Sequence, residues 1–442
     1  MRRTSSSRAV VLSGIWPGLG QAYLRQPRPA AFLALVPLIP LIPLLLALLG
    51  GLDRLLAYPV VPGNDLLLAI AILVGLAFRL LSMALAWRDS APKRSARIQP
   101  ALAVFVAAVI GIHAVLTYGA VGLYGVTTRV FSGVVSDVTA PDPSASAGTT
   151  GGDIVLPSAL PPPQAGERLS FLLIGSDFGT GYTHSLTDTL IVVSVDPATA
   201  DVVMASIPRD TSRFPMYSGG KFNDKINALM TRAQQDPTKY PDGPLGTLTK
   251  EVSFLVGIPI QYVAYINLGG FEKLIDALGG IDVVVAKRID DTFYQFPNGP
   301  KGFHLPAGPA HLDTAHAVAY VRSRYGAGDN DFTRARRQQQ VLIAIKDKLT
   351  DPATLPKLPH ILDVVSRLIS TNFPPDQVSQ MIDLSHQVTP DSISQFVLGP
   401  PYAIRPAGSG EYMLVPDMDR YAKWSIKYFG IASRYNATAS TP

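Results

Sequence analysis

The sequence predicts three membrane-spanning helices followed by an α/β sandwich domain, and three observations lead to this fold class. Charged residues make up 16% of the 442-residue chain and hydrophobic residues 47%, a balance that argues against a disordered chain and points to a membrane protein. The longest apolar runs all precede residue 123. After residue 168, short apolar runs alternate with amphipathic stretches, which is the pattern of strands and helices packed in layers.

The positive charge of the chain is unevenly distributed. The net charge is +5, and residues 1–29 contain five arginines and no acid. Residues 88–99 contain four basic residues and one acid. Because this charge lies beside apolar segments, it indicates membrane-flanking loops and argues against a nucleic-acid-binding surface. Cysteine is absent, which excludes disulfides, thiolate metal sites and a cysteine nucleophile.

Three apolar stretches are long enough to cross a hydrocarbon core of about 30 Å. They lie at about 30–50, 66–87 and 101–122, so we expect a three-span transmembrane region over 30–122. Prolines in the first stretch are expected to kink it, which membrane helices tolerate.

The positive-inside rule sets the orientation of these spans. Residues 1–29 and the loop 88–99 are predicted to face the cytoplasm, and three spans then place the rest of the chain outside the cell membrane. Within the N-terminal segment, the run at 10–24 contains PGLGQAYL, and its turn residues suggest an interfacial or re-entrant segment. The sequence therefore predicts a multi-pass membrane protein with an extracytoplasmic domain.

The remainder of the chain divides into a linker, a domain and a tail. Residues 123–168 are rich in Pro, Ser, Gly and Ala, which predicts a flexible linker. A folded domain is expected over 169–435, followed by a tail at 436–442. Short β-branched runs predict strands at 169–174, 189–195, 202–207, 260–267, 281–285, 392–398 and 412–415. Helical spacing of apolar residues predicts helices at 223–236, 247–256, 270–278, 310–318, 331–348, 358–369, 375–385 and 417–430.

Two aspartates stand at neighbouring strand ends. Asp177 follows the first predicted strand, and Asp188 directly precedes the second. Carboxylates that converge at one sheet edge can bind a hard cation such as Mg²⁺. Both residues can equally serve as turn residues that bind local backbone amides, and the two interpretations stay open.

Basic residues follow the third predicted strand. Pro208 breaks the strand, so Arg209 and Asp210 are expected beyond the sheet edge. Lys221 and Lys225 lie four residues apart, on one face of the predicted helix start. Either lysine alone is typical of a solvated surface charge.

The densest group of arginines lies in YVRSRYGAGDNDFTRARRQQQVL. If YVRSR is a strand, Arg322 and Arg324 share one face. In the following helix, Arg334, Arg337 and Gln338 share one stripe. Guanidinium groups suit bidentate phosphate binding, so the pattern predicts a polyanionic ligand, and two carboxylates with a metal would suit a magnesium-bound pyrophosphate. A solvated run of charges is the alternative.

These segments together resemble the LytR-CpsA-Psr family of bacterial cell-envelope proteins. Seven blocks occur in the family's order within residues 170–345, namely LLIGSD, TDTLIVVSVDP, SIPRD, DKINA, GFEKLIDALGGIDV, AYVRSR and DFTRARRQQQ. The resemblance implies a three-layer α/β/α sandwich with a mixed central sheet and an apolar tunnel for a polyprenyl chain.

The resemblance also implies an activity. Such a protein is a phosphotransferase of cell-wall assembly that moves a glycan from an undecaprenyl-pyrophosphate carrier to peptidoglycan, with Mg²⁺ as cofactor. By that pattern, Asp177 and Asp188 bind the metal, and Arg209, Asp210, Arg322 and Arg324 are the candidate catalytic residues. The implied pyrophosphate ligands are Arg209, Lys225, Arg322, Arg324, Arg334, Arg337 and Gln338. Asp210 is a candidate general base, with Asp188 as its rival.

The chain departs from the family pattern in three ways. Leu186-Thr187 stand where Arg-Ser is usual, Thr333 replaces a usual glycine, and most relatives have a single membrane span. Two other functions stay open. One is a pyrophosphohydrolase that cleaves the same lipid with water, and the other is a non-catalytic lipid-pyrophosphate binding or regulatory protein of the envelope.

Overall fold

The structure is a computed structural model of the chain, which divides into two compact units. One unit comprises residues 1–128 with 375–382, and the other comprises 129–374 with 383–442. The residues described are 6–49, 55, 58, 63–90, 100–130, 134–135, 154–158, 167–176, 186–297, 299–357, 360–361, 364–365, 369–374, 377–408 and 410–429.

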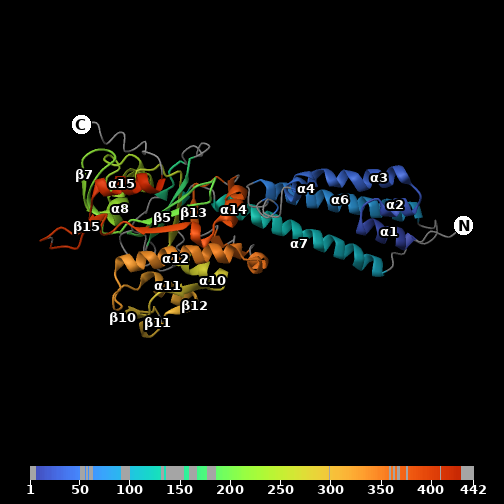
Figure 1. Ribbon diagram of the computed structural model, residues 1–442. Coiled ribbons are helices and arrows are strands. Elements are labelled where there is room, and N and C mark those ends of the chain that lie inside the picture. Colours follow the sequence, from blue (N-terminus) through green and yellow to red (C-terminus); the bar gives the residue numbers. More distant parts are fainter. Residues whose placement is uncertain are drawn as a thin grey trace, which may run out of the picture. The chain divides into compact units, whose positions relative to one another are not determined.

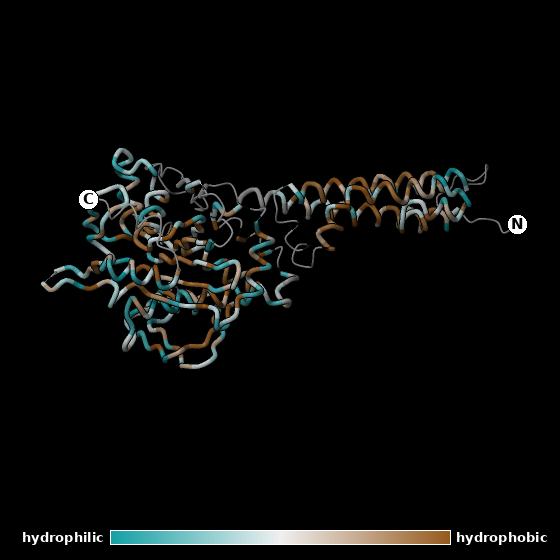
Figure 2. The backbone as a smooth tube through the Cα atoms, turned by 45° about the horizontal axis from the view of Figure 1, so that its top comes forward, coloured by the Kyte–Doolittle hydropathy of each residue, from teal (hydrophilic) through white to brown (hydrophobic). Residues whose placement is uncertain are grey.

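Three helical stretches of the first unit are long and apolar enough to span a membrane (Figure 2). They cover Pro27–Leu49, Asn64–Ser90 and Pro100–Gly122, in agreement with the three predicted spans. The first is interrupted, because Pro40 lies within the 3₁₀ turn η1 (Val36–Leu41) between two α-helices. Proline lacks an N–H donor and its ring crowds the preceding turn, so the regular helical pattern does not continue through it. The helices of these stretches are α3 (Pro27–Leu35), α4 (Ile42–Leu49), α6 (Asn64–Ser90) and α7 (Pro100–Val130).

A short helical hairpin precedes the first span. Its helices α1 (Ser6–Ile15) and α2 (Leu19–Tyr23) are joined through Gly18, whose φ of 91° is left-handed. Gln21 Nε2 donates to the Ser82 carbonyl of α6 at 2.9 Å, and Ser82 Oγ donates to Gln21 Oε1 at 2.8 Å. Buried polar pairs of this kind tie helices together in membranes. The segment predicted to be interfacial or re-entrant is therefore a helical hairpin held against α6.

The second unit is built on a six-stranded sheet in the order β13-β8-β3-β4-β5-β14. Its strands are β3 (Leu169–Ser176), β4 (Thr187–Val195), β5 (Val202–Ser206), β8 (Tyr262–Asn267), β13 (Ile369–Thr371) and β14 (Ile393–Val397). β3 is parallel to β8 and β5 to β14, whereas the other neighbours are antiparallel. The sheet is therefore mixed, and the predicted fold class is confirmed.

Helices cover both faces of this sheet and give the sandwich its three layers (Figure 1). Side chains alternate along each strand, so Leu172 and Ile174 of β3 pack into the core beneath α9 and α15, whereas Leu173 faces the opposite layer. The first layer contains α8 (Leu229–Gln235), α9 (Gly243–Val256) and α15 (Met418–Phe429). The other contains α10 (Leu268–Leu278), α11 (Thr314–Arg322) and α12 (Asp331–Thr350).

Two predicted helices are wrong in part. The range 310–318 begins in strand β12 (Gly308–Leu312), which pairs with β9 (Ile281–Val285), and α11 begins only after Asp313. Asp313 caps that helix, because its side chain accepts the backbone N–H of His316 at 2.8 Å.

The helix predicted over 223–236 also begins later. Residues Lys221–Lys225 form β7, which pairs with β6 (Ser212–Pro215). The helical part follows as η3 (Ile226–Ala228) and α8. Strand pairing across the β6–β7 hairpin is a tertiary contact that the local pattern does not encode.

The remaining described elements are short. They are β1 (Val134–Val135), β2 (Ile154–Val155), β10 (Ile289–Gln295), β11 (Lys301–Leu305), η4 (Pro352–Lys357), α14 (Val378–Gln387), η6 (Pro390–Ser392), β15 (Ala403–Ile404) and β16 (Val415–Pro416). α7 continues to Val130, into the range predicted as linker. The tail at 436–442 and most of the helix predicted over 358–369 lie outside the described residues.

Helix α9 carries a buried carboxyl group that makes the stability of the fold depend on pH. Glu251 is fully buried, and its Oε2 accepts the Tyr217 N–H at 3.2 Å. Burial raises the pKa of Glu251 to about 8. Between the ordinary glutamate pKa and this value, the folded state holds a proton that the unfolded chain releases. Stability therefore falls with rising pH, by roughly 1.4 kcal/mol per unit in that window.

We expect Glu251→Gln to flatten this dependence. The variant should match the wild type near pH 5 and exceed its stability by about 3 kcal/mol at pH 8, because the amide has no proton to lose. Denaturant unfolding of the full chain in micelles, followed by tryptophan fluorescence at both pH values, measures the difference. Asp391→Asn, at an exposed position, is the control and should leave the slope unchanged. An unchanged slope in Glu251→Gln would remove Glu251 as its source.

Candidate active site

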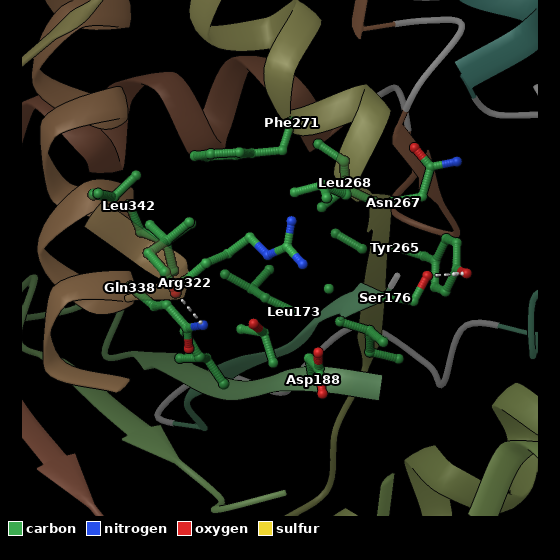
Figure 3. Close-up of a pocket in the computed structure, with 18 of the residues that line it drawn as sticks. Leu173, Ser176, Asp188, Tyr265, Asn267, Leu268, Phe271, Arg322, Gln338 and Leu342 are labelled. Atoms are coloured by element: carbon green, nitrogen blue, oxygen red, sulfur yellow. Dashed lines mark hydrogen bonds between the residues drawn. The ribbon is translucent and has the colours of Figure 1, made fainter. Parts of the chain in front are cut away.

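A cavity of about 370 Å³ lies between the sheet and helices α10 and α12 (Figure 3). One part of its lining is apolar and includes Leu173, Ile191, Ala264, Ile266, Phe271, Leu274, Val341, Leu342, Ile345 and Ile369. The polar lining includes Ser176, Asp188, Arg209, Asn267, Arg322, Arg324, Arg334 and Gln338. A cavity divided in this way suits an amphiphile with an apolar tail and a polyanionic head.

The sheet topology gathers polar residues at one edge. Ser176 ends β3 and pairs with Asn267, which ends the parallel strand β8. On its other side Ser176 pairs with Thr187, where the antiparallel strand β4 begins. Asp188 therefore stands at the same edge as the ends of β3 and β8. Ser176 lies in the LLIGSD block, but neither Ser176 nor Asn267 is charged, and neither was predicted as a site residue.

Ion pairs fix the loop that follows β5. Arg209 Nη1 donates to Asp188 Oδ1 at 2.7 Å, and Lys225 Nζ lies 2.9 Å from Asp210 Oδ1 and 3.0 Å from Glu411 Oε1. Burial acts to lower the pKa of Arg209, but the carboxylates of Asp188, Asp331 and Asp210 together outweigh it, so the pKa is raised overall. Arg209 and Asp188 line the cavity, whereas Asp210 and Lys225 are not among its lining residues.

The arginines of the YVRSR segment lie at the end of a helix and just after it, and not on a strand. The strand predicted there is wrong, because α11 continues to Arg322 and Ser323 is its C-cap. Arg322 and Arg324 nevertheless both line the cavity. Asp291, which is 1% exposed, fixes the turn between them. It accepts the Ser323 hydroxyl at 2.7 Å and the backbone N–H groups of Arg324 and Tyr325, each at 3.2 Å.

Arg322 extends its side chain into the cavity. Figure 3 shows its guanidinium between Phe271 and Leu173, pointing away from α12. No carboxylate among the described residues forms an ion pair with it, in contrast to Arg209 and Arg334. Its charge is therefore available to a ligand.

Helix α12 supplies Arg334 and Gln338. Arg334 is 7% exposed, and its Nη2 lies 3.0 Å from Asp331 Oδ1. Burial lowers the pKa of Arg334. The Nε atoms of Arg334 and Arg209 are buried and have no hydrogen-bond acceptor among the residues described. Buried donors without acceptors are costly, so an anionic ligand would stabilise this arrangement.

Arg337 does not line the cavity. Its Nη1 lies 3.1 Å from Asp329 Oδ2, its Nη2 donates to the Ser323 carbonyl, and its guanidinium lies 5.5 Å from the centre of the Tyr320 ring. Thr333 adds to this loop, since its hydroxyl donates to Asp329 Oδ1 at 3.1 Å. The structure thus gives Arg337 a positioning role beneath the loop that carries Arg324.

Loss of Arg337 is expected to destabilise the domain. Arg337→Ala leaves the half-buried Asp329 carboxylate unpaired, which should cost about 3 kcal/mol. The thermal unfolding of the full chain in micelles measures it. Arg336→Ala, on the exposed side of the same helix, should change stability by less than about 0.5 kcal/mol. Equal stability of the two variants would contradict the positioning role.

The predicted metal pair is only half described. Asp177 lies outside the described residues, and Asp188 lines the cavity. Within the described part of the chain, no group of three or more Asp, Glu, His or Cys residues could hold a metal ion. Magnesium does not need such a group, because it commonly binds one or two carboxylates together with water and substrate phosphate oxygens.

The fold and the arginine-lined cavity define a class of protein. The LytR_cpsA_psr family model matches residues 144–425, more than half of the chain, and the chain belongs to this family.

The chain is similar to two teichoic acid transferases. The chain is 30% identical over 215 residues to the polyisoprenyl-teichoic acid–peptidoglycan teichoic acid transferase TagU of Bacillus anthracis, a match covering 49% of this chain and 64% of that protein. It is 30% identical over 207 residues to the corresponding transferase TagV of Bacillus subtilis, covering 47% and 50%. The chain thus matches less than two thirds of the length of these relatives. The crystal structure of B. subtilis TagV aligns with a TM-score of 0.48 and 24% identity, covering 60% of this chain and 98% of that one.

Proposed function

We propose that this protein transfers a glycan, together with one phosphate, from a polyprenyl-pyrophosphate carrier to a sugar hydroxyl of peptidoglycan. The observation that carries the proposal is the division of the cavity. Its apolar walls suit a prenyl chain, and four arginines facing one lining aspartate suit a pyrophosphate. The names of the relatives TagU and TagV, which describe teichoic acid transfer to peptidoglycan, support the same reaction class.

The proposed reaction is a phosphoryl transfer. The acceptor hydroxyl oxygen forms a bond to the phosphorus that carries the glycan, the bond from this phosphorus to the bridging oxygen breaks, and polyprenyl phosphate leaves. The hydroxyl proton passes to a base. Such transfer depends on positioning and charge neutralisation, and Arg322, Arg324 and Arg334 would bind the negative charge that gathers on the departing phosphate.

The two carboxylates considered as bases differ in position. Asp188 lines the cavity and is partly exposed, with 36% of its side chain accessible. Asp210 is 6% exposed and paired with Lys225. Asp188 is therefore better placed to meet an acceptor, and Asp210 is better placed to orient the loop of Arg209.

Magnesium remains part of the proposal, and Asp188 is its proposed ligand among the described residues. Arg209 occupies Asp188 Oδ1, and Oδ2 accepts no hydrogen bond from another described residue. One carboxylate oxygen and the phosphates of a substrate would fit the usual Mg²⁺ ligand set. The ion would neutralise pyrophosphate charge.

We also propose an orientation for the membrane unit. The arginine-rich N-terminal segment lies in the cytoplasm, and the three spans then place the family domain outside. This side of the membrane holds the proposed acceptor. Protease accessibility of the domain in intact cells and inverted vesicles tests the orientation, and protection in intact cells would overturn it.

The reaction is tested with the full chain in micelles, a polyprenyl-pyrophosphate glycan, soluble peptidoglycan fragments and Mg²⁺, followed by mass spectrometry. The expected product is a glycan joined to peptidoglycan by a phosphodiester, lost on addition of a chelator. Free glycan phosphate, formed equally without peptidoglycan, would indicate a pyrophosphohydrolase. A bound and intact lipid would indicate a binding protein.

A further inference from the structure

Two exposed aromatic side chains stand together beside the cavity. Phe293 of β10 is 67% exposed and Tyr325 is 61% exposed. Their rings meet edge to face with centres 6.2 Å apart. Lys301 Nζ lies 5.7 Å from the Phe293 ring centre, and the Arg324 guanidinium lies 5.2 Å from the Tyr325 ring centre. We call Phe293 and Tyr325 the aromatic shelf.

The shelf is held by a buried carboxylate. Asp291 Oδ1 accepts the backbone N–H of Phe293 at 3.1 Å, and Asp291 Oδ2 accepts that of Tyr325 at 3.2 Å. One carboxylate therefore fixes the backbone at both shelf residues while their rings stay in solvent. Large apolar side chains held outward in this way mark interaction surfaces.

The shelf adjoins the arginine cluster, by which we mean the lining residues Arg209, Arg322, Arg324 and Arg334. Arg324, which contacts Tyr325, also lines the cavity, and its Nη1 lies 3.9 Å from Asp331 Oδ1. A third exposed aromatic residue is Tyr412, with the Arg405 guanidinium 5.4 Å from its ring centre. After burial, the carboxylates of Asp331 and Asp210 contribute to raising the pKa of Tyr412.

The segment that carries Tyr412 is hydrogen-bonded to the loop that follows β5. The Leu414 N–H donates to the Asp210 carbonyl at 2.9 Å, and the Ser212 N–H donates to the Leu414 carbonyl at 2.7 Å. Glu411 binds Lys225 at 3.0 Å. Aromatic residues with cations therefore occur on two separate segments, one in contact with Arg324 and the other hydrogen-bonded to the loop that follows β5.

We propose that the acceptor glycan strand lies across the arginine cluster, with its sugar rings stacked on Phe293 and Tyr325 and continuing toward Tyr412. The proposal rests on the proposed function and names where its acceptor binds. Pyranose rings present weakly positive C–H groups, which favour the negative face of an aromatic ring. Lys301, Arg324 and Arg405 complement the carboxylates of the stem peptides. A strand bound here would bring a sugar hydroxyl to the site where the donor phosphates are bound.

The test measures binding of a soluble peptidoglycan tetrasaccharide with stem peptides to the full chain in nanodiscs, without donor, by calorimetry. Loss of two stacking contacts in Phe293→Ala/Tyr325→Ala should weaken binding about tenfold. Tyr325→Phe keeps the ring and should retain wild-type affinity. Leu349→Ala and Ile426→Ala remove exposed apolar side chains elsewhere on the domain and should leave affinity unchanged.

Donor binding is measured in parallel with a polyprenyl-pyrophosphate glycan, and it should be equal in the wild type and the double variant. This readout separates the two proposals, because a wild type that binds no donor contradicts the proposed function. Normal donor binding with less than a twofold change in tetrasaccharide affinity would overturn the acceptor site. A label beside the shelf can also be tested for quenching by brominated lipids of the nanodisc. If the double variant binds the tetrasaccharide as the wild type does but shows less quenching than the wild type, the shelf contacts the membrane surface, and the acceptor site is overturned.

Discussion

Replacing Arg322 by alanine is expected to lower kcat for glycan transfer by about 100- to 1,000-fold. Loss of one preorganised group that binds developing charge has an effect of this size. Arg322 is the strongest candidate because its guanidinium extends into the cavity without a carboxylate partner among the described residues. Single-turnover transfer by the full chain in micelles, at saturating donor, measures the chemical step.

Arg336→Ala is the matched control. It removes the same side chain from an exposed position on α12, so it should keep wild-type activity. Arg322→Lys should recover only a small part of the loss, since an ammonium group cannot bind phosphate in a bidentate manner. Arg322→Ala with a rate within tenfold of the wild type, and with unchanged thermal unfolding, would exclude Arg322 from charge neutralisation.

The second large effect is expected from blocking the apolar part of the cavity. Ala264 of β8 lines this part, and Ala264→Trp would fill much of a space of about 370 Å³. Each excluded CH₂ group costs about 0.8 kcal/mol, so excluding three or four of them lowers donor affinity roughly 100-fold. Binding of a long-chain polyprenyl-pyrophosphate donor to the full chain measures the effect.

A short-chain donor provides the internal control. Its pyrophosphate meets the same arginines, but its tail does not reach the blocked part, so Ala264→Trp should bind it as the wild type does. Ala264→Val, a smaller change, should weaken long-chain binding only slightly. Undiminished binding of the long-chain donor to a folded Ala264→Trp variant would show that the prenyl chain lies elsewhere.

Much of the fold could be predicted because its elements carry local signals. The β-branched runs of β3, β4 and β5 stand between turn residues, and Gly279, with a φ of 75°, stops α10 where predicted. The failures concern elements whose structure depends on a pairing strand outside their own segment. β7 and β12 are strands because β6 and β9 pair with them.

The residues of the candidate site could also be predicted only in part. Arg209 follows a proline that ends its strand, so its place at the sheet edge could be deduced from the sequence. Arg322 and Arg324 were predicted to share one face of a strand, whereas they line the cavity from the end of α11 and the residues that follow it. Asp291 was missed, because a buried aspartate that binds a turn more than thirty residues later has no sequence signature. Arg337 was grouped with the phosphate ligands because its contacts with Asp329 and Ser323 cannot be deduced from helical periodicity.

The departures from the family pattern have different structural consequences. Thr333 joins Asn330 in a reciprocal cap of α12, since each side chain binds the other's backbone N–H. The residue in place of the usual glycine thus stabilises the helix that carries Arg334. Leu186 and Thr187 provide no positive charge beside Asp188, and His184 lies outside the described residues.

The place of β14 in the sheet constrains how the domain can be made. Residues 393–397 cover the edge of β5, and Gln339 joins the two strands by donating to Ser206 Oγ at 2.8 Å and to the Phe396 carbonyl at 2.7 Å. Ribosomes synthesise β14 about 190 residues after β5. Until then the growing chain carries an open, apolar strand edge, which is a template for aggregation. A chain truncated before residue 393 would keep that edge exposed.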